Sequence, residues 1–556
     1  MVDHPGEPAM MTQLQGLMQD DFPLTVQHIR RALTANRPDA TIATLLAPGE
    51  VQKASFAEVS ERVDRLARVL AKLGVEEGDR VGTFAWNNQR HFELYFAIPC
   101  VGAVLHTLNI RLFEEQLTYI VNHAEDKVIF VDASLVGLLE KLAPTFETVQ
   151  TYVVMGDAET GQLPGALRYE DLMEEAGEGG YDYPELDERA AAALCYTSGT
   201  TGNPKGVLYS HRSISLHSTA TMFRDGLGLS RSDRALVVVP MFHANAWGLP
   251  HGAALAGADL VMPDRYLGAE PLVGLIESQR PTLMGCVPTI FSDVLRYADE
   301  HEQVDLSSLT NATCGGSAVP RQLMKDFEER HGVRIFQAWG MTETSPVATF
   351  CRPPEGEHDD EYWDMRAKQG RPLPWVELRL LDDEGAEVPR DGSSTGEIEV
   401  RGPWIAAAYF REEDGGEKFD EGWLRTGDIA TVDEQGYVQI TDRSKDVIKS
   451  GGEWISSVEL ENELMSHPHV VEAAVIAKPD ERWAERPLCC VVLQEQCDTG
   501  PEELLEHLRG RVAKFWLPDE FAFVSEIPKT SVGKFDKKVL RGQLAEGSLE
   551  GRVKVT

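Results

Sequence analysis

Residues Tyr196–Val207 read YTSGTTGNPKGV, a run rich in glycine and hydroxyl side chains that also carries one lysine. Glycine permits positive φ and a close approach of the backbone to a ligand. Hydroxyl groups donate hydrogen bonds, and a lysine ammonium is a point charge suited to polyphosphate. The run therefore predicts a phosphate-binding loop that uses Thr197, Ser198, Gly199, Thr200, Thr201, Gly202 and Lys205.

This run is no Walker loop, because Asn203 and Pro204 separate Gly202 from Lys205. A Walker motif needs glycine directly before the lysine. The alternative for a loop of this composition is a polar turn between two elements.

A second run, QAWGMTETSP from Gln337 to Pro346, follows the apolar residues VRIF. We expect a ligand-binding loop at the end of a strand. Thr342 offers a hydroxyl to a phosphate, and Glu343 offers the hard oxygen that Mg²⁺ prefers. Thr197 and Glu343 are the candidate metal-binding residues. The alternative is that the Thr-Glu pair only caps a helix.

Strands and helices alternate through the first two thirds of the chain. FAEVSERVDRLARVLAKL, Phe56–Leu73, has apolar residues at helical spacing and is followed by a glycine. Apolar runs that begin near Lys127, Val149, Leu236 and Asp259 have the length of buried strands. Such alternation predicts an α/β fold of parallel β-α-β subdomains with helices on both faces of the sheets.

The pattern changes after about Arg371, where short strand-like runs with turn signals predict a β-rich subdomain. Beyond Lys449 the chain predicts a small α+β unit, in which 501–515 reads as one helix. Residues 170–180, EDLMEEAGEGG, read as an exposed loop.

The composition excludes some partners. The 556 residues carry 53 basic and 90 acidic side chains, a net charge of -37. Nucleic-acid and anionic-membrane surfaces need a basic footprint, so neither is expected. Any ATP site must therefore be a locally basic region of an otherwise acidic protein. The acidic surface suits either an ordinary cytoplasmic enzyme or a protein of a saline habitat.

The eight cysteines show no C-x-x-C or metal-ligand spacing, which is typical of reduced thiols in the cytoplasm. The first ten residues lack the basic and apolar regions of a signal peptide. No apolar run is long enough to predict a transmembrane segment.

Five further motifs carry candidate residues. All but GWLRTGD have a structural alternative, namely a turn, an aromatic-rich core loop or a solvated linker. Asp428 in GWLRTGD offers a carboxylate that can accept both hydroxyls of a ribose. The other four are CGGSAVP (314–320), PMFHANAWG (240–248), DRSKDVIKSGGEWISSVELE (442–461) and IPKTSVGKFDKK (527–538).

In order and spacing these motifs resemble the adenylate-forming superfamily of acyl-CoA synthetases, luciferases and peptide-synthetase adenylation domains. The resemblance covers nearly the whole chain and is closest to medium- and long-chain fatty acyl-CoA synthetases. It implies a large N-terminal domain, residues 1–441, a hinge linker, residues 442–447, and a small mobile C-terminal domain, residues 448–556. Trp339 departs from the commoner tyrosine, but an adenine can stack on either ring.

The resemblance also implies roles for individual residues. Lys534 would bridge the carboxylate and the α-phosphate, Lys445 would be the pivot, and Lys449 and Trp454 would face ATP or CoA by turns. His243, Ala244 and Trp247 would line the acyl pocket, with the tryptophan as its gate. The remaining nucleotide-binding candidates are Gly315, Gly316, Ser317, Gln337, Ala338, Trp339, Gly340, Asp428 and Arg443.

The expected function is ATP-dependent activation of a fatty acid as acyl-adenylate, followed by transfer of the acyl group to CoA with Mg²⁺ as cofactor. One alternative is a CoA ligase for another carboxylate, such as a short methylthio-alkanoate. A second is an adenylation enzyme that loads a carrier protein in trans, and a third is a non-catalytic homologue. Retention of Lys205, Glu343 and Lys534 disfavours the third. The resemblance also implies a possible homodimer.

Overall fold

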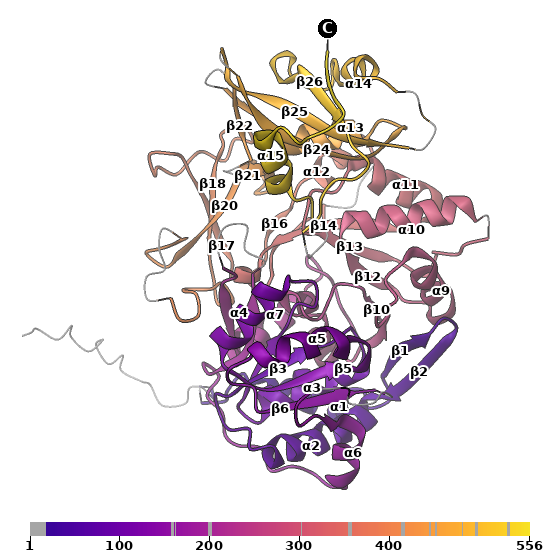
Figure 1. Cartoon of the computed structure of the whole chain (residues 1–556), viewed down its shortest axis with the longest axis vertical. Coiled ribbons are helices and arrows are strands. Elements are labelled where there is room, and N and C mark those ends of the chain that lie inside the picture. The colour runs from indigo at the N-terminus through magenta and orange to yellow at the C-terminus, as the bar shows by residue number, and fades with distance from the viewer. Residues whose placement is uncertain are drawn as a thin grey trace, which may run out of the picture.

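The computed structural model describes residues 18–555, apart from residues 20, 157–160, 162, 198–202, 302, 354–357, 413–417, 444–445, 451–452, 481, 495–496, 498 and 531–533. The side chains of Glu453 and Trp454 also lie outside the description. Figure 1 shows the N-terminal elements at one end of the molecule and the C-terminal elements at the other. No described helix combines the length and the apolar character that a membrane span requires.

Two large sheets form the N-terminal part. The first has the strand order β7-β6-β5-β3-β4-β8-β9, and only its last pair is antiparallel. Its strands are β3 (Arg80–Phe84), β4 (Val104–Thr107), β5 (Asp126–Asp132), β6 (Thr151–Met155), β7 (Leu167–Arg168), β8 (Ala191–Tyr196) and β9 (Gly206–Ser210).

The second sheet has the order β16-β15-β14-β13-β12-β10-β11-β1-β2 and is parallel from β14 to β1. Its strands are β1 (Thr41–Ala47), β2 (Glu50–Ser55), β10 (Arg234–Val237), β11 (Asp259–Met262), β12 (Leu283–Cys286), β13 (Asn311–Gly315), β14 (Arg334–Gly340), β15 (Val347–Phe350) and β16 (Arg371–Pro372).

Helices fill the space between the two sheets and cover their outer faces. The middle layer contains α1 (Val26–Ala35), α2 (Phe56–Lys72), α3 (Gln89–Cys100), α6 (Tyr169–Glu175), α7 (His211–Thr221) and α8 (Leu249–Ala256). Helix α3 is buried on every side from His91 onward, as expected of a helix between two sheets. The outer faces carry α4 (Glu114–Ala124) and α5 (Val136–Leu142) on one sheet, and α9 (Ala269–Gln279), α10 (Pro288–Glu300) and α11 (Arg321–His331) on the other.

The β-rich subdomain is a third sheet, which follows the short helix α12 (Asp360–Arg366). Its strands are β17 (Glu377–Leu381), β18 (Gly396–Arg401), β19 (Phe419–Asp420), β20 (Trp423–Val432) and β21 (Val438–Arg443).

A fourth sheet forms the C-terminal part, where β24 and β25 pair along their length. It contains β22 (Ile448–Ser450), β23 (Glu453–Ile455), β24 (Val470–Asp480), β25 (Ala484–Leu493), β26 (Glu520–Phe523) and β27 (Arg552–Lys554), with α13 (Ser457–Met465), α14 (Pro501–Leu508) and α15 (Lys537–Glu546). The α/β architecture with a β-rich subdomain and a small α+β C-terminal part is confirmed. The domain limits at 441 and 447 stay predictions.

Two local predictions were wrong. Residues 170–180 are not all loop, because Leu172 and Met173 pack into the core and continue helix α6 to Glu175. The helix expected over 501–515 ends at Leu508, two residues before Gly510, whose φ is +77°. Glycine readily leaves the helical conformation, which explains the early end.

Candidate active site

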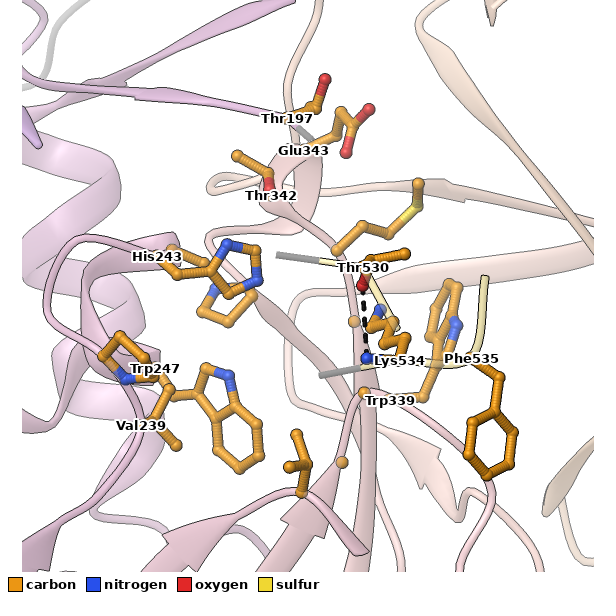
Figure 2. A pocket seen from close by; sticks show the side chains of 18 of the residues that line it. Thr197, Val239, His243, Trp247, Trp339, Thr342, Glu343, Thr530, Lys534 and Phe535 are labelled. Carbon is orange, nitrogen blue, oxygen red and sulfur yellow. Dashed lines mark hydrogen bonds between the residues drawn. The ribbon is translucent and has the colours of Figure 1, made fainter. Parts of the chain in front are cut away.

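A cavity of about 580 Å³ opens where four parallel strands of the second sheet end. Strands β10, β12, β13 and β14 all present their carboxyl ends to it, and in-register pairs such as Cys286 with Cys314 hold these ends level. Ligands of open α/β sheets bind at this edge. Figure 2 shows His243 and Trp247 along one side of the cavity and Trp339 and Lys534 along the other.

The phosphate motif forms the connection between β8 and β9. The backbone N–H of Thr197 donates to the carbonyl of Lys205 (2.9 Å), and the N–H of Lys205 donates to Oγ1 of Thr197 (3.2 Å). These two bonds close the loop at its base and bring Thr197 and Lys205 to the cavity. The candidates Ser198, Gly199, Thr200, Thr201 and Gly202 lie outside the described residues.

Lys205 is engaged by a residue far away in the sequence. Its ammonium lies 2.6 Å from both carboxylate oxygens of Glu412 and 5.1 Å from the ring centroid of Tyr409. A carboxylate at this distance stands in for an anionic ligand. Any phosphate bound by Lys205 must therefore compete with Glu412.

Thr342 and Glu343 follow β14 in a short 3₁₀ turn (Thr342–Thr344) and both line the cavity. Oε1 of Glu343 accepts a hydrogen bond from the hydroxyl of Tyr409 (2.7 Å). The carboxylate is buried, and no lysine or arginine of the described residues forms an ion pair with it. A buried carboxylate without an ion-pair partner, beside a phosphate loop, fits a hard cation such as Mg²⁺.

The backbone preceding this turn requires glycine. A Cβ on Gly340 would collide with the carbonyl oxygen of Pro346. Ala338 and Gly340 also line the cavity. The expected loop therefore begins only after Gly340, because strand β14 continues through the first four residues of the motif.

Asp428, the ribose candidate, is held from two sides. The indole N–H of Trp339 donates to Oδ2 of Asp428 (2.9 Å), and Nε of Arg443 lies 2.9 Å from Oδ1. The carboxylate of Asp428 is the main cause that raises the pKa of Arg443. Trp339 and Arg443 line the cavity, whereas Asp428 is buried and is linked to the cavity through these two partners.

Gly315 ends β13, Gly316 follows it, and both line the cavity. A Cβ on Gly316 would lie 3.4 Å from Cε of Lys534, so a small residue leaves room for the lysine stem. Ser317 is exposed and does not line the cavity.

Lys534 reaches the cavity from the C-terminal part. Its backbone N–H donates to Oγ1 of Thr530 (3.2 Å), and its carbonyl accepts from the N–H of Thr530 (2.7 Å). Desolvation and the nearby Arg443 lower the pKa of Lys534 to about 8, although Asp428 and Glu343 oppose the shift. Within the described part of the chain, no carboxylate forms an ion pair with this ammonium.

The side of the cavity formed by 243–247 is largely apolar. Ala244, Asn245, Ala246 and Trp247 all have positive φ, between 43° and 59°. This left-handed turn lays the indole of Trp247 against Gly285 and Gly315, where added Cβ atoms would lie 3.6 Å and 3.2 Å from its ring. Left-handed turns are costly for non-glycine residues, so this geometry indicates a functional constraint.

His243 begins this turn and faces the same space as Lys534. Desolvation lowers the pKa of His243 to about 3, and the charges of Lys534 and Arg111 add to the effect. The imidazole is therefore neutral at physiological pH. It can exchange hydrogen bonds with a bound carboxylate without adding a further charge.

Some candidates are not brought to the cavity. The side chain of Gln337 forms four hydrogen bonds that connect β14 to neighbouring loops. Its oxygen accepts from the backbone of Val319 and the side chain of Gln369, and its NH₂ group donates to the carbonyls of Arg366 and Ala367. Lys449 is exposed on β22 and does not line the cavity. Lys445 and the side chain of Trp454 lie outside the described residues.

Sequence reasoning missed three residues that the fold brings into the site. Arg111 lines the cavity near His243, Tyr409 contacts both Glu343 and Lys205, and Glu412 pairs with Lys205. Tyr409 and Glu412 belong to an irregular segment between β18 and β19. No periodicity or motif in that segment pointed to the phosphate loop.

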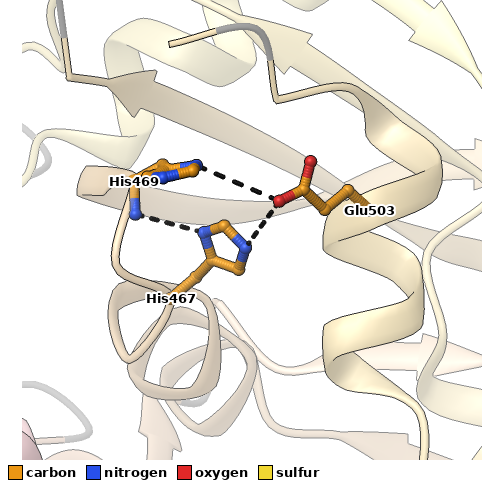
Figure 3. A group of neighbouring side chains, drawn as sticks. All are labelled: His467, His469 and Glu503. Carbon is orange, nitrogen blue, oxygen red and sulfur yellow. Dashed lines mark hydrogen bonds and ion pairs between the residues drawn. The ribbon is translucent and has the colours of Figure 1, made fainter.

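A second group of side chains has the appearance of a metal site. His467, His469 and Glu503 bring ligand atoms within 4.8 Å of one another in the C-terminal part (Figure 3). However, Nδ1 of His467 accepts the backbone N–H of His469 (3.2 Å). The neutral ring then carries its proton on Nε2, which faces Glu503 at 3.4 Å. A protonated nitrogen cannot coordinate a metal, so this group is better explained by hydrogen bonding.

Comparison with known proteins identifies the class. The family model of AMP-binding enzymes matches residues 30–410, and that of the AMP-binding enzyme C-terminal domain matches residues 459–534. The chain belongs to the AMP-binding enzyme family. AMP-forming CoA ligases of this family use ATP, Mg²⁺ and CoA, and the chain is an ATP-dependent CoA ligase of this kind.

Individual relatives cover nearly the whole chain. It is 44% identical over 519 residues to 3-methylmercaptopropionyl-CoA ligase of Ruegeria pomeroyi, covering 91% of this chain and 95% of the relative. It is 47% identical over 511 residues to long-chain-fatty-acid–CoA ligase of Thermus thermophilus, covering 90% and 92%. Among solved structures, the anthranilate CoA ligase AuaEII in complex with anthranoyl-AMP superposes with a TM-score of 0.86 at 28% identity, covering 96% of this chain and all of that one.

Proposed function

We propose that this enzyme activates a fatty acid as its acyl-adenylate and then transfers the acyl group to CoA. The observation that carries the proposal is the position of Lys534. Its ammonium faces a cavity with an apolar wall on one side and Trp339 and Arg443, both bound to the buried Asp428, on the other. Its lowered pKa reflects a desolvated cation without a carboxylate in contact. An anion bound between the two walls would compensate it.

The chemistry follows from the weakness of a carboxylate as an acyl donor. Its oxygen attacks the α-phosphate of ATP, an O–P bond forms, and the bond to pyrophosphate breaks. Negative charge accumulates at this centre and is offset by preorganised cations, of which Lys534 and Lys205 are the candidates. Mg²⁺, held by Glu343 and Thr197, would supply further positive charge to the phosphates.

The second step forms a thioester. The sulfur of CoA, after loss of its proton to solvent, attacks the acyl carbonyl, and AMP leaves. By family resemblance the C-terminal part rotates between the two steps, so that the side chains of β22 and β23 replace Lys534 at the cavity. Lys449 is exposed on β22, at the surface of the C-terminal part.

The acyl group would lie along the apolar side of the cavity. Val239, Trp247 and Ile290 line that side, and neutral His243 marks its polar end. A second candidate substrate is a short methylthio-alkanoate, which one relative is named for. The indole of Trp247 packs against Gly285 and Gly315 on this side, and as the expected gate of the acyl pocket it would have to move to admit a longer chain.

A substrate panel tests the proposal. Pyrophosphate release with CoA present would be measured with acetate, butyrate, octanoate, palmitate and 3-methylmercaptopropionate. The highest kcat/KM with octanoate or palmitate would support a fatty acid, and the highest value with 3-methylmercaptopropionate would support the alternative. Replacing CoA by a carrier protein tests the alternative of an adenylation enzyme that loads a carrier protein in trans. The cytoplasmic location and the homodimer stay predictions.

A further inference from the structure

A second cavity, of about 700 Å³, opens at the opposite edge of the same sheet. Arg334 begins β14, Asn311 begins β13, and both line this cavity, whereas the active-site cavity lies at the other ends of these strands. The length of β14 separates the two by about 20 Å at ~3.3 Å per residue. Its remaining lining residues are Arg224, Asp225, Thr310, Phe336, Arg352, Pro353, His358, Tyr362, Arg371, Gln435 and Tyr437.

The lining is strongly basic in a chain whose net charge is -37. Four arginines and one aspartate face the cavity. Desolvation lowers the pKa of Arg352, and the like charges of Arg334 and Arg224 lower it further, against the weaker opposite effect of Asp225. Mutual repulsion between guanidinium groups is unfavourable unless an anion lies among them.

Three of these four arginines, Arg334, Arg352 and Arg371, have no ion-pair partner among the described residues. Nη2 of Arg352 donates to the carbonyl of Gly226 (3.2 Å), but its buried Nε has no described acceptor.

Aromatic rings hold these guanidinium groups in place. That of Arg352 lies 4.5 Å from the ring centroid of Phe336, and that of Arg371 lies 5.4 Å from the ring centroid of Tyr437. Contacts of this kind orient a guanidinium without neutralising it. The donors therefore stay available to a ligand.

We propose that this cavity binds a phosphorylated small molecule that carries at least two negative charges. Guanidinium groups match phosphate oxygens in charge and in paired geometry, which explains the use of arginine on three separate strands and loops. Tyr437 and Phe336 also offer ring surfaces beside the charges. The ligand is either a nucleotide or an inorganic polyphosphate, and the site is separate from the catalytic one.

Isothermal titration without Mg²⁺ tests the proposal with two probes, inorganic tripolyphosphate and ADP. We expect two sites for at least one probe in the wild-type enzyme and in the variant R296Q/R509Q. The latter removes two exposed arginines elsewhere and so matches the change in net charge. In R334Q/R371Q we expect one of the two sites to weaken by about 10-fold or more, because the ligand loses its hydrogen bonds to two charged groups. K205A should weaken the other site.

Binding of ADP at the second site would identify a nucleotide, and binding of tripolyphosphate alone would identify an inorganic polyphosphate. Both arginines are exposed, and R334K/R371K, which keeps the charge, should bind within a few fold of wild type even if the glutamine variant is unstable. A single site that K205A removes would overturn the proposal. So would a second site whose affinity is unchanged in R334Q/R371Q.

Discussion

The indole N–H of Trp339 donates a hydrogen bond to the carboxylate of Asp428 at 2.9 Å, deep in the wall of the active site. The other oxygen of the same carboxylate, Oδ1, pairs with Nε of Arg443 at 2.9 Å. A carboxylate has about four acceptor directions, so two remain for the two hydroxyls of a ribose. Trp339 thus does more than offer a ring to the adenine, because it also fixes the orientation of the residue expected to bind the ribose.

Replacing Trp339 by Phe keeps an aromatic face and removes only the N–H. We expect kcat/KM for ATP to fall by about 10-fold or more, the effect of one lost hydrogen bond to a charged group. The preference for ATP over 2′-deoxyATP should also fall, because a loosely held Asp428 binds the ribose hydroxyls less well. Steady-state pyrophosphate release with each nucleotide measures both quantities, and D428N serves as the matched comparison. If W339F lowered kcat/KM for ATP and for 2′-deoxyATP by the same factor, Trp339 would act by stacking alone.

Replacing Lys534 by Ala should abolish adenylation and spare the second step. The ammonium is needed while negative charge gathers at the α-phosphate, and loss of one preorganised charge in a desolvated site costs roughly 10²-fold or more. Conversion of a supplied acyl-adenylate to the thioester should proceed at nearly the wild-type rate. The assigned role is incorrect if both half-reactions suffer alike.

The lowered pKa of Lys534 predicts a dependence on pH. A lysine is charged below its pKa, so the cation is progressively lost as pH rises through about 8. The kcat/KM for adenylation reports groups of the free enzyme, and it should decline on the alkaline side of that value. K534R, whose guanidinium stays charged, should lose this decline even if its maximal rate is lower. A profile for K534R that matches the wild type would assign the titration to another group.

Much of the fold follows from local patterns. Helix α2 was predicted at Phe56–Leu73 and occupies Phe56–Lys72, because its apolar stripe has a single period and Ser55 caps it with Glu58. The buried strands were equally clear. Helix α6 was missed because packing of its apolar side chains against the core stabilises it. The early end of α14 was missed because a single glycine causes it.

The phosphate motif was readable from its composition, and Lys534 was found through the family resemblance of the loop that contains it. Their partners were not. Glu412 lies 207 residues after Lys205, and Trp339 lies 89 residues before Asp428. Such pairs are created by the packing of separate subdomains, which no local period records.

Replacing Glu343 by Gln should raise the Mg²⁺ concentration needed for half-maximal adenylation. The amide keeps the size of the side chain but loses the charge that would hold the cation. Tyr409→Phe is the matched control, because it removes the hydrogen bond to Glu343 and keeps the charge. We expect the control to need only slightly more Mg²⁺. An unchanged requirement in E343Q would leave Glu343 with a structural role.

Replacing Glu412 by Gln should strengthen ATP binding. Lys205 would lose its internal counter-ion, so a phosphate would no longer compete with a carboxylate 2.6 Å away. The pair is partly exposed, and we expect KM for ATP to fall by only a few fold. A raised KM would mean that Glu412 instead orients Lys205 for its ligand.

Replacing Lys445 by Pro tests the hinge. Residue 445 lies outside the described residues, but its neighbours connect the two parts of the chain, since Arg443 pairs with Asp428 and the N–H of Ser457 donates to Asp442 (2.7 Å). Proline fixes φ near −65° and restricts the residue before it. An enzyme held in the arrangement with Lys534 in the cavity should still release pyrophosphate in one turnover but transfer the acyl group very slowly, so that acyl-adenylate accumulates. Rapid-quench assays of the two half-reactions measure this, with Lys445→Ala as the control that leaves the backbone free. An ordinary solvated linker predicts a mild loss of stability and equal effects on both steps.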